Sequence, residues 1–230
     1  MTFFINSVYF GMVLTFVAYE IGLFCKKKIR LAIVNPVVIA SLIVGAVLVL
    51  GKIDYETYSE SVQYITYFLT PATVCLAIPL YRQIHLLKKY PLAIMGGVFS
   101  GVLTAMVSIY FIALIFGLTH EQYITLLPKS ITTAIGMGIS EKMGGIVTLT
   151  VVAISVTGIT GTLSAEFMLK LFRIKNPVAK GLAIGTCSHA LGTTKAMEMG
   201  EVEGAMSSLA IVLTGILTVI GVSIFANFIG

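Results

Sequence analysis

Polar and ionisable residues interrupt an otherwise apolar sequence between Gly185 and Glu198. This stretch holds an imidazole, several hydroxyls and two charges, and it lies between hydrophobic segments long enough to span a bilayer. Each ionisable group at membrane depth carries a desolvation cost, so its presence there indicates a role in binding or proton transfer. On a helix, His189, Gly192 and Thr193 share one face, so the imidazole and the hydroxyl would point together.

His189 is the central residue of this group, and Ser188 precedes it. Its imidazole changes charge near neutral pH, which suits a proton-coupled step, and Glu198 is the second candidate for coupling. A structural histidine bonded to a backbone carbonyl is the alternative. Lys195 is a candidate anion ligand, although Glu198 lies three residues further on and could neutralise it as a helical pair.

A second polar group follows Pro128. A small carboxylate requires hydrogen-bond donors and a cation, and the hydroxyls of Ser130, Thr132 and Thr133 would supply donors together with the N–H groups of a half-helix. Lys129 is the first candidate for the cation. The alternative is a lysine that extends its ammonium from the membrane boundary into water.

The composition places the chain among integral membrane proteins. Hydrophobic residues make up 57% of the sequence and charged residues 11%, against roughly 25% charged residues in soluble domains. Runs without charge, or with the single acid Glu20, reach the roughly 20 residues that a helix needs to cross a bilayer. These runs are Phe3 to Phe24, Leu31 to Gly51, Ser61 to Tyr81, Tyr90 to Thr119, Met143 to Ala165 and Gly204 to Gly230.

Two further segments, Ser130 to Ser140 and Gly181 to Ser188, are too short for ordinary spans and contain or adjoin helix breakers. Irregular backbone at membrane depth occurs where it is buried in protein or lines a cavity, and paired broken segments point to a transporter's binding site. The sequence therefore predicts an all-α, polytopic integral membrane helical bundle with about six full spans plus two short broken or re-entrant segments, in a single domain over residues 1–230.

The distribution of charge predicts the topology. If Gln122 to Ser140 enters the membrane and returns, the basic cluster from Lys170 to Lys180 lies inside and the acidic residues from Glu198 to Glu203 lie outside, as the positive-inside rule prefers. We therefore expect a re-entrant segment. A full crossing that violates the rule is the alternative.

Several classes of function are excluded by what the residues lack. The basic residues lie in short loops beside membrane spans, so the net charge of +5 indicates no nucleic-acid partner. Cys25, Cys75 and Cys187 form neither a disulfide framework nor a metal-binding spacing, so we expect no metal and no cofactor. No nucleophile and base recur in a known arrangement, so we expect no catalytic residues and no enzyme.

Three strings make a family resemblance visible. They are Pro71-Ala-Thr-Val-Cys-Leu-Ala-Ile-Pro-Leu-Tyr81, Leu126-Leu-Pro-Lys-Ser-Ile-Thr-Thr-Ala134 and Ala183-Ile-Gly-Thr-Cys-Ser-His-Ala-Leu-Gly-Thr-Thr-Lys-Ala-Met-Glu198. Together they resemble the LrgB/CidB family of bacterial membrane proteins, over nearly the whole chain. The resemblance implies a multi-pass protein of the bacterial cytoplasmic membrane that works with a small LrgA-like membrane protein. It also implies an antiholin-like modulator of murein hydrolase activity and autolysis, while related proteins are similar to carriers of small carboxylates.

Two functions from different classes remain open. The broken segments with polar groups favour a carrier of small monocarboxylates of the pyruvate, lactate and glycolate class. The alternative is a holin-type pore or a regulator that acts by assembly in the bilayer, including assembly as a homo-oligomer. The glycines Gly96, Gly97, Gly101, Gly158 and Gly161 indicate close helix packing rather than ligand contact.

Overall fold

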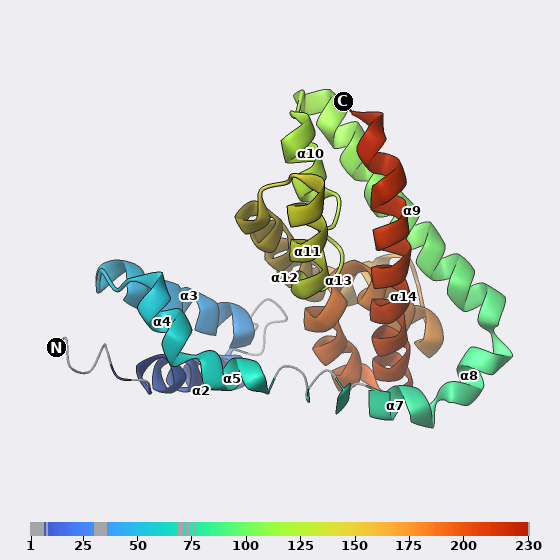
Figure 1. The fold of residues 1–230 in the computed structure, drawn as a ribbon. Helices are drawn as coiled ribbons and strands as arrows, with labels where there is room; N and C mark the ends of the chain where they lie inside the picture. The colour runs from blue at the N-terminus through green and yellow to red at the C-terminus, as the bar shows by residue number, and fades with distance from the viewer. Residues whose placement is uncertain are drawn as a thin grey trace. The chain divides into compact units, whose positions relative to one another are not determined.

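The computed structural model describes residues 7, 9–29, 36–68, 71, 74–75 and 77–229. Every regular element in these ranges is a helix, which confirms the predicted all-α class. The chain forms two compact units, Met1–Cys75 and Leu76–Gly230, and each is described by itself (Figure 1).

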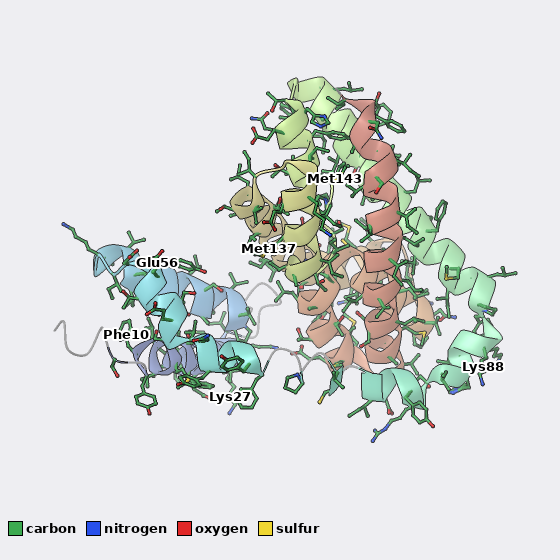
Figure 2. All side chains as sticks on the ribbon, in the orientation of Figure 1. Phe10, Lys27, Glu56, Lys88, Met137 and Met143 are labelled. Atoms are coloured by element: carbon green, nitrogen blue, oxygen red, sulfur yellow. The ribbon has the colours of Figure 1, made fainter. Side chains whose placement is uncertain are left out.

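The first unit contains α2 (Phe10–Lys28), α3 (Pro36–Leu50), α4 (Tyr55–Ser61) and α5 (Gln63–Tyr67). The hydroxyl of Ser61 accepts a hydrogen bond from the Gly11 N–H at 3.0 Å, and this bond ties the end of α4 to the start of α2. Lysines occupy the last turn of α2, where they complement the helix dipole, and Figure 2 shows Lys27 among them.

The second unit contains α7 (Ala77–Arg82), α8 (Ile84–Lys89), α9 (Pro91–Phe116), α10 (His120–Leu126), α11 (Thr133–Met143), α12 (Val147–Leu171), α13 (Pro177–Met199), α14 (Glu201–Phe225) and η1 (Ala226–Phe228). In the described part of the chain, α9, α12 and α14 with η1 are long and apolar enough to cross a membrane, and α3 is a shorter apolar helix.

The span expected at Ser61 to Tyr81 is not one continuous helix. Its described residues belong to α4, α5 and α7 and to turns and isolated helical positions between them, while residues 69–70, 72–73 and 76 lie outside the described ranges. Pro79 lies inside α7, where it cannot donate a backbone hydrogen bond. The described residues of this segment therefore form short helices separated by turns, within a chain whose predicted helical membrane class is confirmed.

The segment from α10 to α11 doubles back on itself. The Ile146 N–H donates to Thr125 Oγ1 at 2.8 Å, and Thr150 Oγ1 donates to the Thr125 carbonyl at 2.9 Å. The chain beyond α11 has thus returned to the end of α10, and the turn between the two helices lies at residues 127–132. We call α10, this turn and α11 the first hairpin.

Helix α13 is also broken, at His189, whose φ of 41° and ψ of −134° are not helical. A Cβ on Gly192 would lie 3.0 Å from the Ile184 carbonyl oxygen. Eight residues along a straight helix are about 12 Å apart, so the two halves of α13 must fold against each other. We call α13 the second hairpin, with His189 at its tip, and it confirms a break directly after the segment Gly181 to Ser188.

The second hairpin overturns one part of the predicted topology. Lys180 Nζ lies 4.0 Å from Glu203 Oε1, and Arg82 Nη1 lies 3.5 Å from Glu201 Oε1. The acidic residues after α13 are therefore at the same end of the unit as the basic residues, and their expected placement on the opposite side was wrong. The physical reason is that α13 returns to the end at which it begins.

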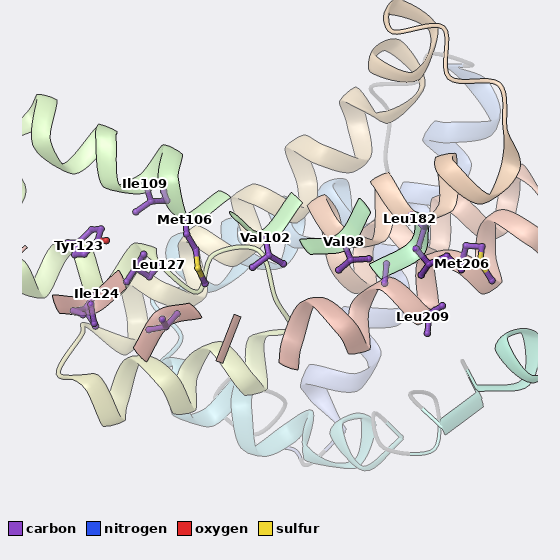
Figure 3. Close-up of a cluster of buried hydrophobic side chains, with 14 of the residues drawn as sticks. Val98, Val102, Met106, Ile109, Tyr123, Ile124, Leu127, Leu182, Met206 and Leu209 are labelled. Atoms are coloured by element: carbon purple, nitrogen blue, oxygen red, sulfur yellow. The ribbon is translucent and has the colours of Figure 1, made fainter. Parts of the chain in front are cut away.

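A cluster of buried apolar side chains holds these elements together (Figure 3). One face of α9 contributes residues at helical spacing, and α10, α13 and α14 pack against it. The labelled members are Val98, Val102, Met106, Ile109, Tyr123, Ile124, Leu127, Leu182, Met206 and Leu209. The neighbouring face of α9, which carries small residues, is left to form a cavity wall.

Candidate anion-binding cavity

A cavity of about 670 Å³ lies between α9 and the first half of α13, and we call it the α9–α13 cavity. Its volume falls in the range of small-molecule sites, roughly 300–1,000 Å³. The wall on α9 is made of small residues, which is why space remains there. The lining residues are Tyr90, Ala93, Gly97, Gly101, Thr104, Ala105, Lys129, Ser130, Asn176, Val178, Ala179, Leu182, Ala183, Thr186 and Cys187.

The first hairpin contributes a cation to this cavity. Lys129 lines the cavity, and its Nζ donates a hydrogen bond to Ser130 Oγ at 3.1 Å. The side chain is half-buried, and none of the ion pairs found among the described residues involves it. The lining also contains neither aspartate nor glutamate. A desolvated ammonium without a carboxylate partner is a site at which an anion would be stabilised.

The second hairpin contributes Thr186 and Cys187 to the same cavity. Thr186 is 9% exposed, and its Oγ1 has no hydrogen-bond partner. A buried hydroxyl without a partner costs free energy, so a ligand that accepted from it would remove that cost. A Cβ on Gly101 would lie 2.7 Å from Thr186 Cγ2, so this glycine is required for the close approach of α9 to α13.

The other polar residues of the second hairpin bond to protein groups. His189 Nε2 lies 3.1 Å from the Ile154 carbonyl, and because the carbonyl can only accept, Nε2 carries the proton. Thr193 Oγ1 donates to the His189 carbonyl at 3.0 Å and lies 2.7 Å from Ser207 Oγ. His189 and Thr193 are buried and are absent from the cavity lining. These contacts match the alternative of a structural histidine bonded to a backbone carbonyl.

Close helix packing surrounds this tip. A Cβ on Gly158 would lie 2.6 Å from His189 Cε1, and a Cβ on Gly161 would collide with Ser188 Oγ. A Cβ on Gly192 would lie 2.5 Å from Ser188 Cβ. Gly158 and Gly161 therefore pack helices closely, as predicted, and Ser188 and Gly192 lie inside the packed hairpin rather than at the cavity.

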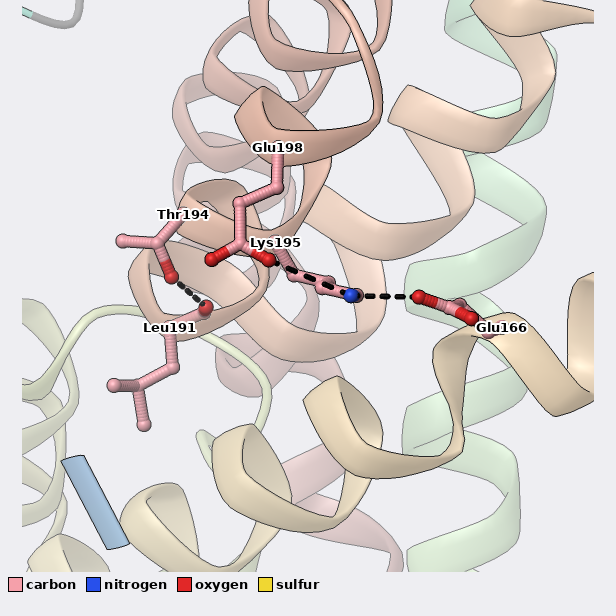
Figure 4. Close-up of polar contacts among 5 residues, drawn as sticks. All are labelled: Glu166, Leu191, Thr194, Lys195 and Glu198. Atoms are coloured by element: carbon pink, nitrogen blue, oxygen red, sulfur yellow. Dashed lines mark hydrogen bonds and ion pairs between the residues drawn. The ribbon is translucent and has the colours of Figure 1, made fainter. Parts of the chain in front are cut away.

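Lys195 is held by carboxylates, as Figure 4 shows. Its Nζ lies 2.6 Å from Glu166 Oε1 and 3.5 Å from Glu198 Oε2. The Glu166 contact joins the second half of α13 to α12, and the Glu198 contact lies within α13. Lys195 and Glu198 do not line the α9–α13 cavity, and neither do Thr132 and Thr133 at the start of α11.

Of the residues proposed from sequence, the structure therefore brings Lys129 and Ser130 to the cavity. Sequence reasoning missed Thr186, and it assigned Gly97 and Gly101 to helix packing alone. The available signal was the spacing of small residues along one face of α9, which is also the signal of helix–helix packing. Within the described ranges, no cluster of His, Cys, Asp or Glu side chains could hold a metal ion, and the three cysteines are free.

Comparison with known proteins identifies the family. The model of the LrgB-like family matches residues 15–228. The chain is 39% identical over 223 residues to the antiholin-like protein LrgB of Bacillus mycoides, covering 96% of this chain and 97% of that protein. It is 38% identical to the antiholin-like protein LrgB of Bacillus cereus with the same coverage. No solved structure matches. With its apolar helices and bacterial relatives, this is a multi-pass bacterial membrane protein that belongs to the LrgB-like family.

Proposed function

We propose that this chain is the substrate-binding component of a membrane carrier for small monocarboxylates of the pyruvate, lactate and glycolate class. The observation that carries the proposal is the half-buried Lys129, which lines the α9–α13 cavity without a carboxylate partner among the described residues. A carboxylate bound there would neutralise the ammonium. The mostly apolar wall would accept the short carbon skeleton of the substrate.

The remaining donors fit the same ligand. Ser130 Oγ already accepts from Lys129, so its own proton is free to donate toward a carboxylate. Thr186 Oγ1 is a second hydroxyl without a partner beside the cavity. We propose Lys129, Ser130 and Thr186 as the direct ligands. His189, Thr193 and the ion-paired Lys195 would position the second hairpin.

The proposal includes an LrgA-like small membrane protein as a partner in transport. It also allows the chain to act as a homo-oligomer. Proteoliposomes that contain the chain with and without the small partner would be assayed for uptake of labelled pyruvate or lactate. We expect saturable uptake that Lys129→Met strongly weakens and Lys129→Arg partly retains. Loss of a hydrogen bond to a charged ligand is worth roughly 1.5–3 kcal/mol, or about ten- to a hundredfold in affinity.

Lys142→Met is the matched control for this experiment. Lys142 is an exposed lysine in the last turn of α11, on the same hairpin as Lys129 but outside the α9–α13 cavity. Its substitution should leave uptake unchanged. If Lys129→Met transports as well as Lys142→Met does, Lys129 does not bind the substrate and the proposal loses its support.

The names of the relatives favour a second candidate, an antiholin-like regulator of murein hydrolase activity and autolysis. A regulator that acts by assembly in the bilayer would need no cation in a cavity. In cells lacking the chain, a Lys129→Met copy should then restore normal autolysis as well as the unaltered chain does. A carrier whose transport controls autolysis should fail to restore it with this variant.

A further inference from the structure

Lys129 also lines a second cavity, of about 500 Å³. It lies between α10 and α12, and we call it the α10–α12 cavity. It extends to Leu118, two residues beyond the end of α9, whereas the α9–α13 cavity extends to Tyr90, directly before α9. Helix α9 has 26 residues, so these two ends are about 39 Å apart at the helical rise per residue. The two cavities therefore extend toward opposite ends of the unit.

Lys129 is the one described residue that lines both cavities. Neither lining contains an aspartate or a glutamate, so an anion would meet no repelling carboxylate in either wall. The α10–α12 cavity adds the polar side chains of Gln122 and Thr157 to apolar residues of α10 and α12. Along the unit, Lys129 therefore lies between the α9–α13 cavity and the α10–α12 cavity.

The turn that carries Lys129 is packed into the protein beside both cavities. Leu127 is 3% exposed and Ile131 is 2% exposed, so both apolar neighbours are packed into the protein. The ammonium itself has one hydrogen-bond partner among the described residues, Ser130. A lysine stem has four rotatable carbons and carries a compact charge, so the head can move while its backbone stays fixed.

We propose that Lys129 is the gate of an anion pathway formed by the two cavities. The ammonium would bind an anion that enters one cavity and, by reorienting its side chain, release it into the other. This inference rests on the proposed carrier function, because the same lysine binds the substrate. Beyond that function, it assigns the two cavities as the route of the substrate and the Lys129 side chain as the group that moves.

The first experiment maps the two cavities without any substrate. Cys187 lines the α9–α13 cavity and is exposed, so a Cys25→Ser, Cys75→Ser background keeps it as a native probe. In a second protein, Cys187→Ser removes this thiol and Thr157→Cys places one in the α10–α12 cavity. Each of the two protein variants would be treated with a membrane-impermeant anionic methanethiosulfonate in right-side-out and in inside-out vesicles.

We expect each thiol to react from one side of the membrane only, and the two thiols to react from opposite sides. Reaction of both from the same side would overturn the two-cavity pathway. So would a thiol that stays unreactive from both sides but reacts after denaturation, because no aqueous cavity would then reach it. Since no substrate is added, these outcomes are independent of whether the protein transports carboxylates.

The second experiment tests the gate. Reaction rates of the anionic reagent are compared with those of a cationic methanethiosulfonate of similar size, because a nearby ammonium favours the anion. We expect the anionic reagent to be favoured several-fold at both thiols, and Lys129→Met to remove this preference at both. Lys142→Met should preserve it. If Lys129→Met changes the preference in one cavity only, the lysine does not serve both and the gate is refuted.

Discussion

Thr193→Val is the most direct test of how the second hairpin is held. Thr193 donates its single hydroxyl proton to the His189 carbonyl, so Ser207 must be the donor in the 2.7 Å bond between the two hydroxyls. Ser207 is 0% exposed. Valine keeps the shape of threonine but removes the acceptor for this buried hydroxyl.

The expected loss follows from these contacts. Hydrogen bonds between membrane helices contribute about 0.6 kcal/mol on average and up to about 1.7 kcal/mol, and an unsatisfied buried donor costs about 1–3 kcal/mol. Ser207 can turn toward a carbonyl of its own helix, so we expect a loss of about 1–2 kcal/mol. For a chain of this size, that lowers the Tm by about 2–8 °C.

The assay is thermal unfolding of detergent-purified protein, with Thr194→Val as the matched control. Thr194 is the neighbouring residue, but it is exposed and its hydroxyl donates to the Leu191 carbonyl within the same half-helix. Its Tm should fall by less than about 2 °C. The Thr193→Val, Ser207→Ala double variant should lose less than the sum of the single losses. Equal shifts for Thr193→Val and Thr194→Val would refute this account of the hairpin.

Further substitutions test the cavity wall and the ion pairs. Gly101→Ala places a Cβ 2.7 Å from Thr186 Cγ2 and should raise the substrate concentration needed for half-maximal uptake, whereas Gly96→Ala meets nothing within 4 Å and should not. Glu166→Gln should lower the Tm more than Glu198→Gln, because their distances to the shared ammonium are 2.6 and 3.5 Å. Both losses should stay below about 1 kcal/mol, since these pairs are partly exposed.

The helical class and the break between α10 and α11 were predictable because each depends on local sequence. Long uncharged runs require helices at membrane depth, and the turn that contains Pro128 separates α10 from α11. The capping box at the start of α10, in which Thr119 and Gln122 exchange hydrogen bonds with backbone N–H groups, is also a local pattern. No turn residue marks the break of α13 at His189. The positive φ of this histidine is uncommon for any residue other than glycine, so the sequence does not predict it.

The site was less predictable because it depends on which residues meet across helices. Sequence reasoning grouped His189 with Thr193 by helical spacing and expected both at a ligand. Their bonds to Ile154 and Ser207 come from α12 and α14, and no periodicity in the sequence identifies those partners. The placement of the acidic residues failed for the same reason, since a span that crosses and a hairpin that returns have the same apolar composition.

The cations of the second unit differ in whether a carboxylate lies beside them. Lys180, Lys195 and Arg82 each lie within 4.0 Å of a carboxylate, and these pairs join elements that the chain must hold together. Lys129 lies where two cavities approach each other, and the described residues offer it no such carboxylate. A lysine kept only for stability would be better replaced there by an apolar residue, because burying an unpaired charge costs more than burying a methyl group. The proposed carboxylate substrate would offset this cost, because its charge is opposite to that of the Lys129 ammonium.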